Sequence, residues 1–274
     1  RGALVLHMLR KQLGEAKWQK TIQLYLKTNA NRVVTTTDFI HAAETVAGES
    51  LQWFFNQWVY KTGHPEFVVT KSYDAAKKQM ALKVVQAQLP DTAAINPVTT
   101  YFKGRVDVEI DDHIETVWLE PKAENTFFFS AEQAPVLVNF DYESTWIKEI
   151  VFEKPLSELI CQLQNDKDIL GKQWAMSQLA KRSTQETTTE TELQQIQVAL
   201  RNVVTGNDYW RIRYNSLVQL QNMVAPMWDD TIVLKDQQII SMLTGLASTE
   251  KAWIKTAAIN FLGMTRDARY TDIY

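Results

Sequence analysis

Histidine serves as a zinc ligand and as an acid or base near neutral pH, and this chain has four: His7, His41, His64 and His113. None of them stands in a His-Glu-x-x-His sequence, the spacing that places two imidazoles on one helix face around zinc. His41 is followed three residues later by Glu44, but no second histidine lies at the fourth position. We therefore assign no metal ligand to this chain and interpret its histidines as helix-surface or core residues.

The sequence also lacks motifs for nucleophilic catalysis and phosphate binding. The one cysteine, Cys161, has no histidine near it in the sequence, so a catalytic thiolate is not expected. There is no Gly-x-Ser-x-Gly, no Walker-type loop and no Gly-x-Gly-x-x-Gly. Asp111-Asp112 and Asp229-Asp230 fall at predicted turns and are interpreted as solvated turn residues. The sequence thus indicates no catalytic and no cofactor-binding residue.

Residues 1–65 are predicted to be helical, because apolar side chains recur there at helical spacing. Gly14 fits a carboxyl-terminal cap of the first helix. Thr35 and Asp38 have the spacing of a capping box, which predicts the start of a further helix. An aromatic-rich helix follows and must end before Pro65, since proline cannot extend a helix.

Residues 66–152 change to a period of two, which predicts strands. About seven short runs separated by turn signals are typical of an all-β sandwich. The first strand begins at Phe67, and the later ones are expected over 80–85, 101–110, 114–119, 125–130, 136–140 and 146–152. The turn signals are Pro90-Asp91, Asp111-Asp112, Glu120-Pro121 and Ala134-Pro135.

Residues 153–274 return to helical periodicity and contain an internal repeat. A pattern of basic, small, apolar and leucine residues occurs three times, at offsets of 220 − 179 = 41 and 262 − 220 = 42 residues. A period of about 40–47 is typical of HEAT and armadillo arrays, whose helix pairs stack because one pair cannot bury its apolar face alone. The copies run from Lys172 to Leu179, from Arg213 to Leu220 and from Lys255 to Leu262.

Three basic residues of this region, Arg211, Arg213 and Lys255, fall on the predicted repeat helices. We interpret them first as residues that pack within the array. Binding of a peptide carboxylate is the alternative that the sequence leaves open. The segment 266–270 resembles the start of another helix pair, so we expect the array to be truncated at 274.

Composition narrows the function classes. Hydrophobic residues make up 45% of the 274, enough for a large core, and the net charge is −3 from 29 basic and 32 acidic residues. This near-balance argues against a nucleic-acid partner, which would need a basic face. One cysteine allows no intrachain disulfide, and no apolar run reaches the ~20 residues of a membrane span. Cytoplasmic and periplasmic locations are both compatible.

Two motifs carry a resemblance to a known family. Arg1-Gly2-Ala3, at the start of an apolar helix, resembles the end of the Tyr-x-Lys/Arg-Gly-Ala motif of the aminopeptidase N family of gluzincin zinc metallopeptidases. The segment from Trp53 to Pro65 resembles that family's tryptophan-rich helix ending in Gly-x-Pro, with Lys61 where the family has glutamine.

The resemblance implies a mixed multi-domain fold: an α-helical tail of a thermolysin-like catalytic domain (1–65), a small all-β sandwich (66–152) and an all-α HEAT/armadillo-like array (153–274). The family's tyrosine, which steadies the oxyanion, would precede Arg1 by two residues, and the zinc motif would lie further upstream. The parent protein would be a zinc-dependent exopeptidase acting on the amino termini of peptides. This chain would enclose the substrate cavity and, alone, is expected to hold no zinc and to be inactive.

The same resemblance leaves alternatives open. A catalytically dead scaffold of the same lineage, as in transcription-factor subunits that keep the fold without the zinc motif, fits this sequence equally. An unrelated binding module would require both motif matches to be coincidences. Expected partners are the catalytic domain, the parent's peptide substrate and a second copy of the chain, because the apolar faces of residues 1–63 would need covering.

Overall fold

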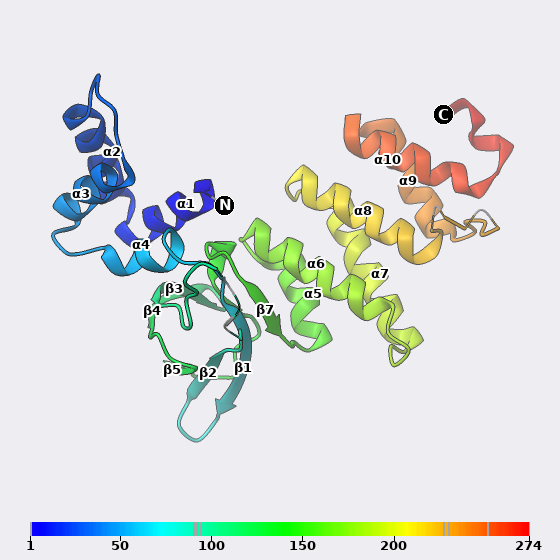
Figure 1. Cartoon of the computed structure of the whole chain (residues 1–274). Coiled ribbons are helices and arrows are strands. Elements are labelled where there is room, and N and C mark those ends of the chain that lie inside the picture. Colours follow the sequence, from blue (N-terminus) through cyan, green and yellow to red (C-terminus); the bar gives the residue numbers. More distant parts are fainter. Residues whose placement is uncertain are drawn as a thin grey trace. The chain divides into compact units, whose positions relative to one another are not determined.

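The computed structural model describes residues 2–89, 93, 95–226, 228–229, 231–250 and 252–273. The chain divides into two compact units, residues 1–153 and 154–274, each of which is described by itself (Figure 1). Helices come first, strands follow, and helices return in the second unit, the order that the periodicity predicts. Arg1 of the first motif, Pro90 and Asp91 of one predicted turn, and Asp230 of one carboxylate pair lie outside the described residues.

The first unit begins with four helices. The capping box is confirmed, since the backbone N–H of Thr35 donates to the Asp38 carboxylate at 2.8 Å. Gly14 has a φ of 77°, a conformation that glycine adopts at little cost, and it separates the first two helices. The helices are α1 (Gly2–Leu13), α2 (Glu15–Thr28), α3 (Thr36–Ala47) and α4 (Gln52–Trp58).

The described residues of the same unit contain seven strands, which form two sheets. The four-stranded sheet has the order β5-β2-β1-β7, in which only β1 and β7 are parallel, and the three-stranded sheet has the order β4-β3-β6. The strands are β1 (Glu66–Asp74), β2 (Gln79–Gln86), β3 (Gly104–Ile110), β4 (His113–Leu119), β5 (Glu124–Ser130), β6 (Val138–Phe140) and β7 (Glu149–Phe152).

Buried aromatic rings join the two sheets to each other and to α4. Phe67 of β1 meets Phe140 of β6 with ring centroids 5.1 Å apart, so the two sheets face each other across an apolar layer. Trp58, at the end of α4, is buried against Phe102 and Trp146 at 4.7 and 5.6 Å. The aromatic-rich helix therefore anchors the helices to the sheets.

Three glutamine side chains hold the segment that leads into β3. Gln86 donates to the carbonyl of Phe102 and accepts from its N–H, at 2.8 and 2.7 Å. Gln57 of α4 makes the same pair with Lys103, at 2.8 and 3.2 Å. Gln12 of α1 repeats the arrangement at Arg105, at 2.9 Å for both bonds. Each amide acts as a short stretch of neighbouring strand.

Three predicted strands begin later than the sequence pattern indicates, and side-chain hydrogen bonds explain the differences. The strand expected from residue 101 begins at Gly104, because the residues before it bond to glutamine amides instead of to a strand. The strand expected from 136 begins at Val138, since Asp111 accepts from the preceding N–H groups at 2.8 and 3.0 Å. The strand expected from 146 begins at Glu149, after a turn that closes on the Asp141 carboxylate.

The second unit consists of helix pairs. Helices α5 and α6, α7 and α8, and α9 and α10 contact within pairs, and α5 contacts α7, α6 contacts α8, and α8 contacts α10 between pairs. The bounds are α5 (Leu156–Asn165), α6 (Ile169–Ser183), α7 (Glu190–Thr205), α8 (Trp210–Val224), α9 (Gln237–Thr249) and α10 (Ala252–Leu262). Short 3₁₀ turns at 263–265 and 268–273 follow, in place of the helix expected from 266.

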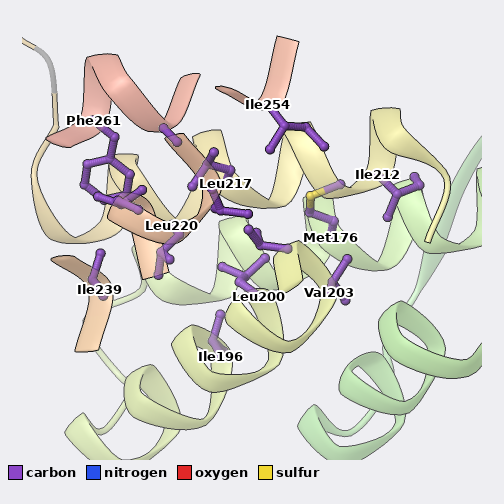
Figure 2. Packing of buried hydrophobic residues seen from close by; sticks show 14 of the residues in the cluster. Met176, Ile196, Leu200, Val203, Ile212, Leu217, Leu220, Ile239, Ile254 and Phe261 are labelled. Carbon is purple, nitrogen blue, oxygen red and sulfur yellow. The ribbon is translucent and has the colours of Figure 1, made fainter. Parts of the chain in front are cut away.

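The small residues of the three predicted copies are alike in their burial within the second unit. Its small residues, Ala175, Ser216 and Ala258, are all fully buried, and the Ser216 hydroxyl lies 3.6 Å from the sulfur of Met176 in the preceding copy. Figure 2 shows the apolar core between the pairs, with side chains from each pair pointing into one cluster. A small residue at each position lets neighbouring helices approach closely.

The basic repeat residues also have equivalent contacts in two copies. The Lys172 ammonium donates to the Gln164 carbonyl and pairs with Asp208, 36 residues later. Arg213 donates to the Val204 carbonyl and pairs with Glu250, 37 residues later. Each cation thus joins the end of the preceding helix to the turn between the two helices of the next pair.

Candidate functional site

The structure places three of the four histidines apart from one another. His7 lies on α1, His41 on α3 and His113 at the start of β4, and all three are exposed. Glu44, one turn after His41, accepts hydrogen bonds from the Ser50 hydroxyl at 2.9 Å and the Leu51 N–H at 2.8 Å. That carboxylate therefore positions the start of α4.

His64 has two carboxylates close to it. Its Nε2 lies 3.2 Å from Oε1 of Glu149, and Glu66 is the direct partner of Glu149 across the parallel β1–β7 pair. One donor atom from each of the three residues lies within 4.8 Å of the others, the only such group with three possible metal ligands in the part of the chain that the structure describes. Sequence spacing does not indicate this cluster, because Glu149 lies 85 residues after His64.

The other polar candidates have structural contacts. Asp111 binds the backbone of residues 136 and 137, and Asp229 accepts from the N–H and hydroxyl of Thr231 at 3.0 and 2.5 Å. The hydrogen bonds from Thr231 hold the pKa of Asp229 below its ordinary value. Cys161 is free and half-buried on α5, with the amide nitrogen of Asn165 3.6 Å from its sulfur.

The basic residues of the second unit divide into packed and exposed ones. Arg213 donates to the Val204 carbonyl and pairs with Glu250, which agrees with the prediction that it packs within the helical region. The Arg211 guanidinium lies over the Trp210 ring at 5.6 Å, and Lys255 is exposed. The structure brings these residues into no common site.

The helices α1, α2, α3 and α4 of the first unit surround a groove. It encloses about 950 Å³ and is lined by α1, α2, α3, α4 and the residues that follow α4. Its floor is apolar and aromatic, and the Phe39 ring packs edge-on against Tyr25 and Phe55 at 5.3 and 6.4 Å. The apolar floor consists of Val5, Leu9, Phe39, Phe54, Phe55 and Trp58.

Large apolar side chains around the same helices are exposed. Leu4 is 53% exposed, Leu6 44%, Leu26 62% and Val33 93%. Single exposed leucines are ordinary on protein surfaces, but Leu6, Val34 and Val59 are exposed and also line the apolar groove, which is typical of an interaction surface. We call the groove together with Leu4, Leu6, Val34 and Val59 the helical docking surface.

Charge is sparse on this surface. Lys61 is the one charged residue among the described residues that line the groove, and Tyr25, Thr35, Thr36 and Thr62 supply hydroxyl groups. Such a surface suits burial against another apolar protein surface. It has no cluster of groups that would catalyse a reaction.

Sequence comparison matches this same helical region to a peptidase. Residues 1–58 match the peptidase family M1 domain. Aminopeptidase N of Haemophilus influenzae is 31% identical over 106 residues, which are 39% of this chain and 12% of that protein. Transcription initiation factor TFIID subunit 2 of Drosophila melanogaster is 22% identical over 255 residues, 82% of this chain and 20% of that protein.

Comparison with solved structures extends the similarity to both units. The crystal structure of Legionella pneumophila aminopeptidase A in complex with aspartic acid matches 99% of this chain with a TM-score of 0.71 at 13% identity. The match covers 35% of that chain. At this identity the likeness shows the fold alone. The chain spans a fifth or less of the curated relatives named above.

Proposed function

Because the chain belongs to the aminopeptidase N family, we propose that it is the non-catalytic, carboxyl-terminal portion of a zinc-dependent aminopeptidase that removes amino-terminal residues from peptides. The match of residues 1–58 to the peptidase domain supports this position, as does the fold likeness of the whole chain to about a third of an aminopeptidase. Zinc and the catalytic residues would come from the parent protein's upstream sequence.

We assign three parts to this portion. Residues 1–65 would be the helical end of the catalytic domain, residues 66–152 a small β-sandwich, and residues 153–274 a HEAT-like array. The facing sheets joined by Phe67 and Phe140 support the sandwich, and the equivalent buried positions of the helix pairs support the array. Together they would close the back of the substrate cavity.

The main structural support for this proposal is the helical docking surface. An apolar groove of about 950 Å³ with exposed leucines beside it is costly in water, because each square ångström of apolar surface left exposed forgoes about 25 cal/mol. The occupant that fits is the remainder of the peptidase domain, since the same residues match that domain and the relatives extend far beyond this chain.

The test is complementation between two polypeptides. The chain and the upstream part of its gene are co-expressed separately, and copurification and hydrolysis of an aminoacyl chromogenic substrate are measured. We expect a stable complex that hydrolyses the substrate, and loss of both when Leu6 and Val59 are changed to glutamate. Phe128→Gln, at an exposed aromatic of β5 outside the surface, is the matched control and should change neither. Copurification that is unaffected by the paired substitution would overturn the proposal.

A catalytically dead scaffold of the same lineage is the second candidate. The similarity to a transcription initiation factor subunit favours it, because that match covers 82% of this chain, against 39% for the Haemophilus aminopeptidase N. A stable complex that neither binds zinc nor hydrolyses the substrate would select this candidate.

A further inference from the structure

His64, Glu66 and Glu149 come together where the helical region leads into the sheets. Gly63, with a φ of 98°, turns the chain toward Pro65, whose carbonyl accepts from the Glu149 N–H at 3.0 Å. This bond starts the parallel ladder in which Glu66 is the direct partner of Glu149. Side chains two residues apart point to one face of an extended segment, so His64 lies beside both carboxylates.

The donor set is that of a transition-metal site. An imidazole nitrogen with two carboxylate oxygens suits Zn²⁺ and its neighbours, whereas Ca²⁺ and Mg²⁺ prefer oxygen ligands alone. Donor atoms of tetrahedral zinc lie about 3.4 Å apart, from metal–ligand distances of about 2.1 Å. His64 Nε2 and Glu149 Oε1, at 3.2 Å, already have that separation. The other separations, within 4.8 Å, need only side-chain rotation, which exposed glutamates can make.

The charges of the two carboxylates are the second observation. Like charges directly opposite on neighbouring strands repel each other. Other glutamates on this sheet and its connections have their negative charge balanced by a lysine. Lys83 pairs with Glu124 at 2.6 Å, and Lys78 pairs with Glu132. Within the described residues, Glu66 and Glu149 form no such pair with lysine or arginine.

We propose that His64, Glu66 and Glu149 bind a divalent transition-metal ion, with Zn²⁺ as the representative, and that the ion joins β7 to the entry of β1. β7 has only four residues and is an edge strand of the four-stranded sheet, so its attachment depends on few backbone bonds. Without the ion, the carboxylates of Glu66 and Glu149 repel each other across this edge. With the ion bound, each carboxylate is attracted to the metal. Its role is structural, and it is independent of the aminopeptidase proposal.

The whole chain is dialysed against a chelator and is then titrated with Zn²⁺ in a calorimeter, which measures the heat of binding. We expect one Zn²⁺ bound per chain, with affinity weakened at least about tenfold by His64→Gln or Glu149→Gln. His113→Gln and Glu124→Gln are the matched controls, an exposed histidine and a lysine-paired glutamate of the same unit. The absence of saturable binding, or equal weakening by the controls, would overturn the proposal.

A thermal-unfolding readout separates a metal site from a merely structural cluster. In chelator, Glu149→Gln should unfold at the same or a higher temperature than the parent chain, because one of two repelling charges is gone. In saturating Zn²⁺ the order should reverse, since only the parent chain gains the binding free energy. The same order in both conditions would contradict the site. Mg²⁺ and Ca²⁺ at the same concentrations should not reproduce the Zn²⁺ effect.

Discussion

Replacing Gln86 by leucine tests the glutamine contacts that hold the segment before β3. Gln86 is 4% exposed, and its amide satisfies both the N–H and the carbonyl of Phe102. Leucine has nearly the same size but makes neither bond. A buried backbone group without a partner costs about 1–3 kcal/mol, so two such groups, less the gain from burying leucine, should cost about 2–5 kcal/mol.

The assay is native-state hydrogen exchange of the β2 and β3 amides, which reports the free energy of opening for this part of the first unit. Gln57→Leu, at a residue 5% exposed, should cost a similar amount. Gln12→Leu should cost about 1 kcal/mol, because water can replace bonds at its half-buried position. Gln19→Leu, on the exposed face of α2, should change the free energy by less than about 0.5 kcal/mol. A Gln86→Leu loss no larger than that of Gln12→Leu would refute the reasoning.

Three further predictions concern the repeat helices, the capping box and the docking surface. Ser216→Leu should destabilise the second unit by about 1–3 kcal/mol in urea denaturation, because Ser216 is fully buried against Met176, and an unchanged midpoint would contradict this packing. The Thr35 N–H lowers the pKa of Asp38, so its contribution to stability is present above the carboxyl's ordinary pKa and is lost as pH falls through the lowered value. The difference in melting temperature between the parent chain and Asp38→Asn should therefore be largest above about pH 5 and shrink below about pH 4. A difference that stays constant with pH would argue against a stabilising role of the Asp38 carboxylate. The isolated chain should associate as its concentration rises in sedimentation velocity, and Leu6→Glu should reduce this association, whereas a monomer at every concentration would count against an exposed docking surface.

Periodicity predicted the kinds of elements and local side-chain chemistry predicted some of their boundaries. The Thr35–Asp38 capping box was found because its whole geometry lies within four residues. The repeat prediction rests on small residues at a fixed period, and the structure buries all three of them, Ala175, Ser216 and Ala258.

Strand starts and the cluster of His64, Glu66 and Glu149 depend on contacts between distant residues. No local pattern indicates that Asp111 binds the backbone 25 residues later, or that Gln57 takes the place of a strand beside Lys103. The pairing of Glu66 with Glu149 follows from the parallel register of β1 and β7, which a single sequence does not specify. Sequence spacing therefore does not indicate that His64, Glu66 and Glu149 lie together.

Thiol labelling of the helical docking surface tests the central claim most directly. In a Cys161→Ser background, Leu6→Cys places one thiol on the exposed part of α1, and Phe128→Cys places one on β5 as the control. Both thiols should react rapidly in the isolated chain at concentrations too low for it to associate. In the complete gene product the thiol at position 6 should become protected while the one at position 128 stays reactive, because the remainder of the peptidase domain covers the docking surface. Equal labelling of position 6 in the isolated chain and in the complete protein would contradict the account.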